Sequence, residues 1–178
     1  MSTCSSSTRR ATPVNSRSTA PSRQANIQLT AGNEHVFIHG QPAPIPRLTF
    51  EDRTLGFIRQ HQLVHTGWLG GAQEQLPAIQ QAKLLLSIDY GEGQNAGFLE
   101  ATRSLANLAF FSLPRGTEEQ ARRRAEEISR GGVDVVVVTR GGEGSLAFYE
   151  GNFYSQPAYP VQVVDSVGAG DAFIGAMA

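Results

Sequence analysis

The chain has 178 residues, of which 40% are hydrophobic and 17% charged, and its formal net charge is −1 at pH 7. This composition is typical of a globular chain of about one domain and excludes the broad basic surface of a nucleic-acid-binding protein. No apolar run approaches the roughly 20 residues of a membrane helix, and the first residues lack the apolar core of a secretory signal. Cys4 is the only cysteine. We therefore expect a cytoplasmic chain without membrane or nucleic-acid partners.

The first 25 residues differ in composition from the rest of the chain. They are rich in serine and threonine, contain almost no large apolar residue, and hold four arginines but no acidic residue. Such a segment cannot bury enough surface to order itself, so residues 1–25 are expected to be a disordered tail before a domain over residues 26–178. An organelle transit peptide has a similar composition, but the missing amphipathic stripe favours a solvated tail or sequence foreign to the domain.

The organised region is expected to open with a β-hairpin. Residues 26–30 and 34–39 are strand-like and are separated by Ala-Gly-Asn. Three prolines within residues 41–46 then predict an extended connector.

Helical and strand patterns alternate from Thr49 onward, as in a parallel sheet with helices on both faces. Thr49 is expected to cap a helix through Ile58, and Thr117 with Gln120 forms a capping box for a helix that ends near Arg130. Other helices are expected over residues 72–83, where Pro77 is tolerated only in a first turn, and over residues 95–106. The expected strands are 63–66, 84–88, 108–112 and 133–139, then antiparallel strands at 145–149, 153–155 and 161–164.

The strand over residues 133–139 leads into the turn Thr-Arg-Gly-Gly-Glu-Gly, residues 139–144. Ligands of open α/β sheets collect beyond the carboxyl ends of the strands, so this turn is placed to line a site. Glycine turns also simply join the strands of a hairpin, and both interpretations stay open.

The last fourteen residues, Asp-Ser-Val-Gly-Ala-Gly-Asp-Ala-Phe-Ile-Gly-Ala-Met-Ala, form a glycine loop that opens a helix. Gly168 and Gly170 allow a tight turn whose N–H groups face one small space, and the helix dipole reinforces its attraction for an anion. Asp171 beside that anion is suited to accept a proton from an approaching hydroxyl, which indicates phosphoryl transfer to an alcohol. The alternative is an ordinary turn with Asp171 as N-cap.

Two other phosphate-binding loops are excluded by spacing. A dinucleotide-binding loop that began at Gly168 would need its third glycine where Phe173 stands. A P-loop needs a lysine after its glycines, whereas Lys83 is the only lysine and follows no glycine loop. A nicotinamide-dependent oxidoreductase is therefore disfavoured.

Residues 165–178 resemble the second signature of the ribokinase, or PfkB, family of carbohydrate and nucleoside kinases. The element order resembles the C-terminal part of the ribokinase fold. The resemblance implies an α/β fold, a ribokinase-like mainly parallel sheet flanked by helices and incomplete at both ends. It implies ATP- and Mg²⁺-dependent phosphorylation of a sugar or sugar-derivative hydroxyl, with Asp171 as general base and Gly168, Ala169 and Gly170 as the anion hole.

The resemblance also implies further site residues. It places the ATP phosphates and ribose along Thr139, Arg140, Gly141, Gly142, Glu143 and Gly144. Arg140 replaces a usually apolar residue and is either solvent-facing or an added phosphate contact. Asp165 and the carbonyl of Val167 would hold a monovalent cation such as K⁺. Asp89 stands where the family often keeps a cleft aspartate, although loop capping explains it equally well, and Trp68 either borders the sugar or packs, with packing favoured.

The chain departs from the family pattern in several places. Family members commonly carry an Asn-x-x-Glu element that organises magnesium, whereas this chain lacks the asparagine and offers Glu118 or Glu119 as substitutes acting through water. That departure resembles sugar-amine kinases of the fructoselysine 6-kinase type. Both ends look cut, so a catalytically inactive chain with weak nucleotide or partner binding is the alternative function, and unpaired strands predict self-association as a homodimer.

Overall fold

The computed structural model describes residues 24–29, 35–41, 47–93 and 95–178. The strands are β1 (Gln24–Leu29), β2 (His35–Gln41), β3 (Leu63–Gly67), β4 (Leu85–Asp89), β5 (Leu108–Ser112), β6 (Val135–Thr139), β7 (Ser145–Tyr149) and β8 (Asn152–Gln156). The α-helices are α1 (Asp52–Ile58), α2 (Leu76–Gln81), α3 (Ala96–Thr102), α4 (Glu118–Arg130) and α5 (Ala169–Met177). Short 3-10 turns occupy Gln73–Gln75, Arg103–Leu105 and Gly141–Glu143.

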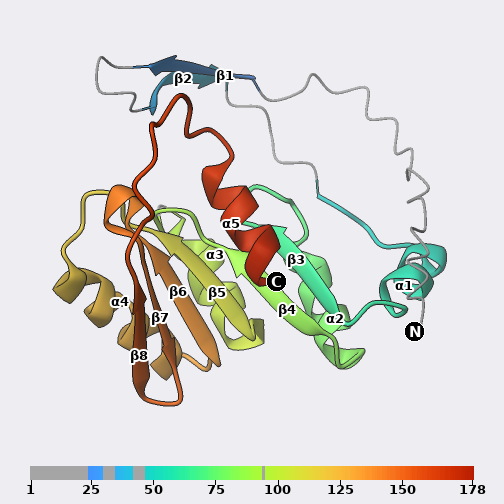
Figure 1. Cartoon of the computed structure of the whole chain (residues 1–178). Helices are drawn as coiled ribbons and strands as arrows, with labels where there is room; N and C mark the ends of the chain where they lie inside the picture. The colour runs from blue at the N-terminus through green and yellow to red at the C-terminus, as the bar shows by residue number, and fades with distance from the viewer. Residues whose placement is uncertain (1–23, 30–34, 42–46, 94) are drawn as a thin grey trace, which may run out of the picture.

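A six-stranded sheet in the order β3-β4-β5-β6-β7-β8 organises the domain (Figure 1). The first four strands are parallel, because helical connections return the chain to the same end of the sheet each time. β7 and β8 add antiparallel hairpins at one edge. The predicted mainly parallel α/β sheet flanked by helices is confirmed.

The main core lies between one face of the sheet and helices α2, α3 and α4. Alternate strand residues point to this face, so Ala109 and Phe111 of β5 lie beside Val136 and Val138 of β6 within one buried cluster. Small residues bring α4 close to the sheet, and its buried side chains are Ala121, Ala125 and Ile128. The predicted capping box of Thr117 and Gln120 starts this helix, which ends at Arg130 as expected.

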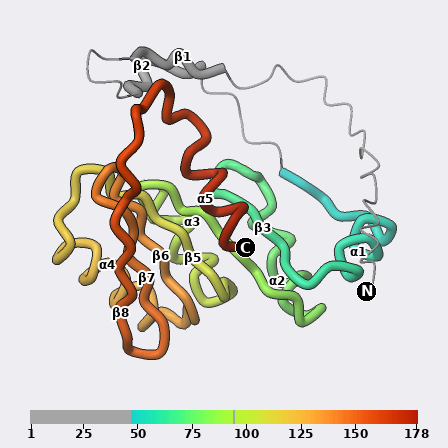
Figure 2. Tube along the Cα trace, in the orientation of Figure 1, coloured from blue at the N-terminus to red at the C-terminus, as the bar shows by residue number. Residues whose placement is uncertain are grey.

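The opposite face of the sheet carries α5 (Figure 2). Phe110 and Val137 point to this face and form a second, smaller buried cluster with Ile174. This face is only partly covered, since Leu85 of β4 and Tyr154 of β8 remain exposed. The two faces of one sheet thus serve different purposes, with one forming the core and the other seating a single helix.

Other predicted elements are found with shifted bounds. Pro77 lies in the first turn of α2, as predicted, and the residues before it form a 3-10 turn. Asn95 caps α3 by accepting the Phe98 N–H at 3.0 Å. The predicted hairpin over residues 26–39 is present as the antiparallel pair β1–β2, although residues 30–34 lie outside the described ranges.

Three expectations are wrong. Thr49 does not cap a helix, because α1 begins at Asp52 and its N-cap residue is Glu51. Residues 161–164 form no strand; β8 is the edge of the sheet, and the chain runs on past the ends of the strands before it turns back as α5 (Figure 2). The tail expected over residues 1–25 extends too far along the chain, since β1 begins at Gln24. Residues 1–23 lie outside the described part of the chain.

Across the described ranges, the helices are all too short or too polar to cross a membrane.

Candidate functional site

A cavity of about 140 Å³ lies where β4, β5 and β6 end and α5 begins. It joins residues that are far apart in the sequence, and its lining is Asp89, Gly91, Phe110, Phe111, Ser112, Thr139, Gly170, Asp171 and Ile174. Of the predicted site residues, it brings together Thr139, Gly170 and Asp171. Because ligand pockets usually measure about 300–1,000 Å³, this cavity suits a phosphoryl group better than a whole nucleotide.

The glycine loop folds tightly onto the start of α5. Gly168 is the N-cap residue and has φ +78°, a left-handed conformation that glycine adopts without the strain of a Cβ. Before it, an oxygen of the Asp165 carboxylate accepts the Val167 N–H at 2.8 Å. The Ser166 carbonyl accepts the Ala169 N–H at 3.1 Å. The segment 165–169 is therefore a closed turn that feeds directly into the helix.

The N–H groups of Gly170 and Asp171 fall in the first turn of α5. A helix cannot satisfy these donors internally, and its dipole adds a partial positive charge at the same end. Gly170 and Asp171 both line the cavity, so the cavity adjoins an anion-attracting helix start.

Asp171 is the third residue of α5, and its side chain is exposed to solvent. The interpretation of Asp171 as the N-cap is wrong, because Gly168 holds that position. Asp171 instead lies within the first turn of the helix. A charged, accessible carboxylate beside an anion-attracting helix start can accept a proton from a hydroxyl group in the cavity.

Two side chains seat α5 on the sheet. Ile174 is buried against Phe110 and Val137, and Phe173 is partly buried beside it. The remaining residues of α5 are exposed. The position of Asp171 over the cavity thus depends on a small apolar contact one turn further along the helix.

Asp89, at the carboxyl end of β4, fulfils both interpretations that the sequence left open. One oxygen of its carboxylate accepts the Gly91 N–H at 2.9 Å, which caps the loop. The same residue lines the cavity opposite α5. Asp89 and Asp171 therefore face a common space from two different elements.

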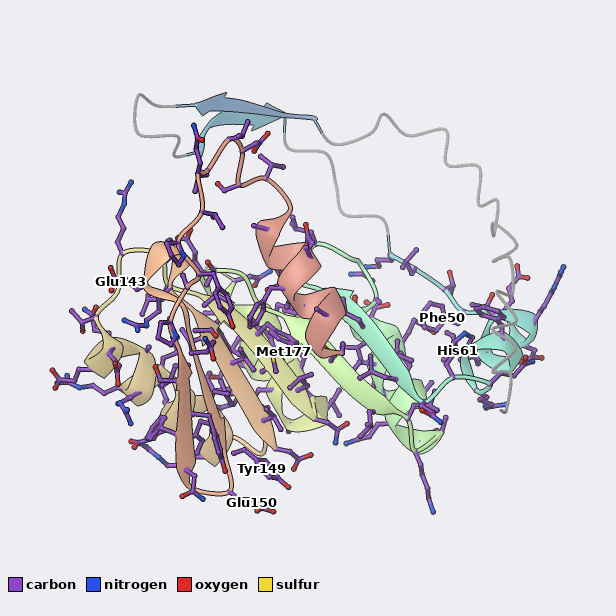
Figure 3. All side chains as sticks on the ribbon, viewed as in Figure 1. Phe50, His61, Glu143, Tyr149, Glu150 and Met177 are labelled. Carbon is purple, nitrogen blue, oxygen red and sulfur yellow. The ribbon has the colours of Figure 1, made fainter. Side chains whose placement is uncertain are left out.

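The turn at residues 139–144 closes the β6–β7 hairpin. Thr139 lines the cavity, and its hydroxyl donates to the Phe111 carbonyl at 3.4 Å. Gly144 has φ +94°, and a Cβ there would lie 2.1 Å from the Gln156 carbonyl oxygen. The glycine therefore lets the chain that leaves β8 pass close over the turn. Figure 3 shows Glu143 of this turn at the opposite end of the hairpin from Tyr149 and Glu150.

Arg140 is buried, with 8% of its surface exposed, so the solvent-facing alternative is wrong. Its Nη2 donates to the Glu143 carbonyl at 3.3 Å and lies 4.0 Å from the carboxylate of Glu118. Its Nε has no hydrogen-bond partner among the described residues. Because Arg140 does not line the cavity, its role as an added phosphate contact stays a prediction, as does the role of residues 141–144.

The two glutamates that were candidate substitutes for the missing asparagine lie on α4. Glu118 pairs with Arg122 at 2.7 Å, and Glu119 pairs with Arg123. Neither glutamate lines the cavity. Asp165 and Val167 are both exposed, and the described ranges contain no group of three or more His, Cys, Asp or Glu residues that could hold a metal ion. The monovalent-cation site stays a prediction.

The sequence did not single out Ser112 or Gly91 as cavity residues. Ser112 pairs with Thr139 across the β5–β6 register, and its N–H donates to the Gly91 carbonyl at 2.7 Å. The register of neighbouring parallel strands is the signal that would have found Ser112, since it ends β5 as Thr139 ends β6.

Comparisons with known proteins agree with this arrangement. Residues 101–178 match the model of the pfkB family carbohydrate kinase. The chain is 27% identical to fructosamine kinase FrlD of Bacillus subtilis over 153 residues, and 28% identical to fructoselysine 6-kinase of Escherichia coli over 151 residues. These matches cover 84% and 85% of this chain, and 54% and 57% of the relatives.

A solved structure shares the fold. Ribokinase of Arabidopsis thaliana, determined with ribose and ATP, superimposes with a TM-score of 0.67 at 20% identity, over 89% of this chain and 55% of the ribokinase. The chain spans about half the length of the relatives it matches. The predicted resemblance is confirmed: this chain is a relative of the pfkB family carbohydrate kinases and is built on part of the ribokinase-like fold.

Proposed function

We propose that the protein containing this chain transfers the γ-phosphoryl group of ATP to a hydroxyl of a sugar or sugar amine. The observation that carries this proposal is the shared cavity, because it joins the Asp171 carboxylate and the first turn of α5 to the ends of three strands. A proton acceptor and an anion-attracting helix start on one cavity are what transfer of a phosphoryl group to an alcohol requires.

In this proposal Asp171 takes the proton from the attacking hydroxyl. In the predicted anion hole of Gly168, Ala169 and Gly170, the Ala169 N–H already donates to the Ser166 carbonyl, so the other N–H groups of the loop stabilise the negative charge that develops on the phosphoryl oxygens. The turn formed by Asp165 and Val167 fixes the direction of these groups. A monovalent cation bound by the Asp165 carboxylate and the Val167 carbonyl would hold that turn without joining the chemistry.

ATP is the proposed phosphoryl donor, with its phosphates and ribose along residues 139–144. Magnesium would arrive with the nucleotide, because Mg²⁺ keeps several waters and binds mainly to phosphate oxygens with one or two carboxylates. Asp89 fits that chemistry, since its carboxylate lines the cavity while one of its oxygens accepts the Gly91 N–H. Magnesium would neutralise the charge of the transferring phosphates.

The relatives support a sugar amine as the acceptor. Two of them are a fructosamine kinase and a fructoselysine 6-kinase, and they align over most of this chain. A ketosugar joined to an amine is therefore the first acceptor to test, ahead of free fructose and ribose.

The test is phosphoryl transfer by the purified chain and two variants. The parent chain, Asp171→Asn and Asp52→Asn are incubated with Mg-ATP and fructoselysine, fructose or ribose, and product is measured by mass spectrometry. Asp52 is an exposed residue of α1 and does not line the cavity, so it is the matched control. We expect product from the parent and control but at least about 10²-fold less from Asp171→Asn, because general-base catalysis contributes about 10²–10⁴-fold. Equal turnover by Asp171→Asn would contradict the role of Asp171.

An alternative is a chain that binds nucleotide without transferring phosphate. The exposed position of Asp171 and the small contact that seats α5 favour it, because a loosely seated helix would spend little time in the reactive geometry. It predicts measurable ATP binding by calorimetry but no phosphorylated product with any acceptor. Product that depends on Asp171 would exclude it.

A further inference from the structure

A second cavity of about 280 Å³ lies beside the loop that follows β3. Its walls carry Arg47, Trp68, Gln73, Glu74, Asn95 and Phe98. The cavity is thus lined by one cation, one anion, two amides and two aromatic rings. It shares no lining residue with the cavity under α5.

The wall that carries Arg47 is held in place by hydrogen bonds. The Leu48 N–H donates to the Gly71 carbonyl at 3.0 Å, and the Phe50 N–H donates to the side-chain oxygen of Gln75 at 3.4 Å. These bonds tie the segment before α1 to the loop after β3. Arg47 therefore belongs to a segment that hydrogen bonds hold in place.

The two charged residues of this cavity, Arg47 and Glu74, form an ion pair that a ligand can separate. A guanidinium nitrogen of Arg47 lies 3.0 Å from a carboxylate oxygen of Glu74, with 83% and 59% of the two side chains exposed. An ion pair this exposed contributes only about 0–1 kcal/mol, so separating its partners costs little. Each partner is then available to a ligand group of the opposite charge.

Trp68 adds an apolar wall and is hydrogen-bonded through its backbone to β4, whose end borders the cavity under α5. Its ring packs against the main core and also lines this cavity. Its backbone N–H donates to the Asp89 carbonyl at 3.0 Å, and Asp89 lines the cavity under α5. Since Gly67 and Asp89 are also partners in the parallel β3–β4 register, Trp68 and Asp89 both lie at the carboxyl end of the strands.

We infer that this second cavity binds the zwitterionic amino-acid end of a sugar-amine acceptor whose reacting hydroxyl reaches the cavity under α5. Arg47 binds the carboxylate, Glu74 binds the ammonium group, and the alkyl chain between sugar and amino acid lies on Trp68. Two opposite charges 3.0 Å apart match an amino acid, which carries an ammonium group and a carboxylate on one carbon. This inference rests on the proposed function, because that function supplies the sugar end of the same acceptor.

Trp68 is the only tryptophan of the chain, so its fluorescence reports on this cavity without any catalytic activity. The chain is titrated with fructoselysine and with N-fructosyl-butylamine, which has the same sugar and amine link but no zwitterion. Variants Arg47→Gln and Glu74→Gln are compared with Arg59→Gln, an exposed arginine at the end of α1 that lines neither cavity. Circular dichroism checks that every variant is folded.

We expect fructoselysine to shift the Trp68 emission and to bind about tenfold more tightly than N-fructosyl-butylamine, the size of one charge-assisted contact at an exposed site. Arg47→Gln and Glu74→Gln should each remove most of that preference, and Arg59→Gln should keep it. Equal affinity of the parent for the two ligands, or an unchanged preference in both cavity variants, would overturn the inference.

The same titration on Asp171→Asn separates this inference from the proposed function. That variant should keep the preference for fructoselysine while losing phosphoryl transfer. A preference without any product from the parent would support the second cavity and count against the kinase activity. Product without a preference would support the kinase activity and overturn the subsite.

Discussion

Phe173 of α5 meets Phe110 of β5 edge to face, with ring centroids 6.5 Å apart and ring planes at 86°. The contact lies next to Asp171 in the chain, so a pair of apolar rings determines where the carboxylate stands. Ile174 completes the contact by packing against Phe110 and Val137. The chemistry proposed for Asp171 therefore depends on packing that carries no polar group.

Ile174→Ala should release α5 from the sheet. Removing a buried isoleucine side chain costs about 2–5 kcal/mol, and α5 has little other contact to compensate. We expect amide hydrogen exchange in α5 to approach that of an exposed segment, while β5 and β6 keep their protection. Met177→Ala is the matched control on the same helix, because Met177 is 45% exposed. Equal exchange of α5 in both variants would show that Ile174 does not seat the helix.

Gly144→Ala should destabilise the chain far more than Gly142→Ala. At position 144 a Cβ would lie 2.1 Å from the Gln156 carbonyl oxygen at a φ of +94°, whereas at position 142 it would meet nothing within 4 Å. We expect a loss of at least about 1–3 kcal/mol for Gly144→Ala and a change within about 0.5 kcal/mol for Gly142→Ala. Urea unfolding followed by circular dichroism measures both. Similar midpoints would mean that the chain does not pass closely over this turn.

Arg140→Met should leave the free energy of unfolding unchanged or raise it. The guanidinium is buried, its Nε lacks a partner among the described residues, and its nearest carboxylate is 4.0 Å away on the half-exposed Glu118. Replacing such a charge by an apolar side chain of similar size is often neutral or stabilising by about 1–4 kcal/mol.

Glu118→Gln is the complementary change for this pair. It should destabilise the chain by about 1 kcal/mol, because it removes the nearest counter-ion of Arg140 and the partner of Arg122. Denaturant titration of both variants measures the sign of each change in the free energy of unfolding. A large loss of stability in Arg140→Met would contradict the view that this charge is poorly compensated.

The stability of the chain should fall at alkaline pH because of Tyr90. Burial raises the pKa of Tyr90, and the hydrogen bond with the Thr102 hydroxyl lowers it by less. A pKa that is higher in the folded chain gives a contribution that is fully present below the unfolded value near pH 10. That contribution is lost as the pH rises through the raised pKa.

Tyr90→Phe should therefore flatten the fall in thermal unfolding temperature above about pH 10. Tyr149→Phe is the control, since the hydrogen bond and the charge of Glu150 raise the pKa of this exposed tyrosine, and solvent screens the effect. Melting curves between pH 8 and pH 11.5 distinguish the two, given that the window brackets the ordinary tyrosine pKa of about 10. Parallel curves for parent and Tyr90→Phe would contradict the assignment.

Much of the scaffold could be predicted from local sequence. Strand 135–139 follows from a run of four valines, and α4 follows from the Thr117 and Gln120 capping box, because both signals depend on residues close in the chain. The false strand at residues 161–164 has the same β-branched character. There, however, the chain runs past the ends of the strands toward α5 instead of extending the sheet, and only the tertiary arrangement decides between the two.

The site residues could be predicted where they lie in one short segment. They could not be predicted where the fold brings several distant segments together. The start of α5 at the Gly168–Gly170 loop was visible because the glycines and Asp171 lie within a few residues. The burial of Arg140 near Glu118 of α4, and the cavity beside Trp68, depend on contacts between distant segments. Periodicity and spacing carry no information about such contacts.

The connection over residues 157–168 reaches α5 without forming a strand, and α5 then rests on two side chains. The proposed base thus lies on a helix that few contacts hold to the sheet. Only the molecules in which this helix is seated can react. The measured rate would be the rate of the seated state multiplied by the fraction of molecules in that state. Any group that holds α5 against the sheet would raise this fraction and act as an activator without touching a reacting atom.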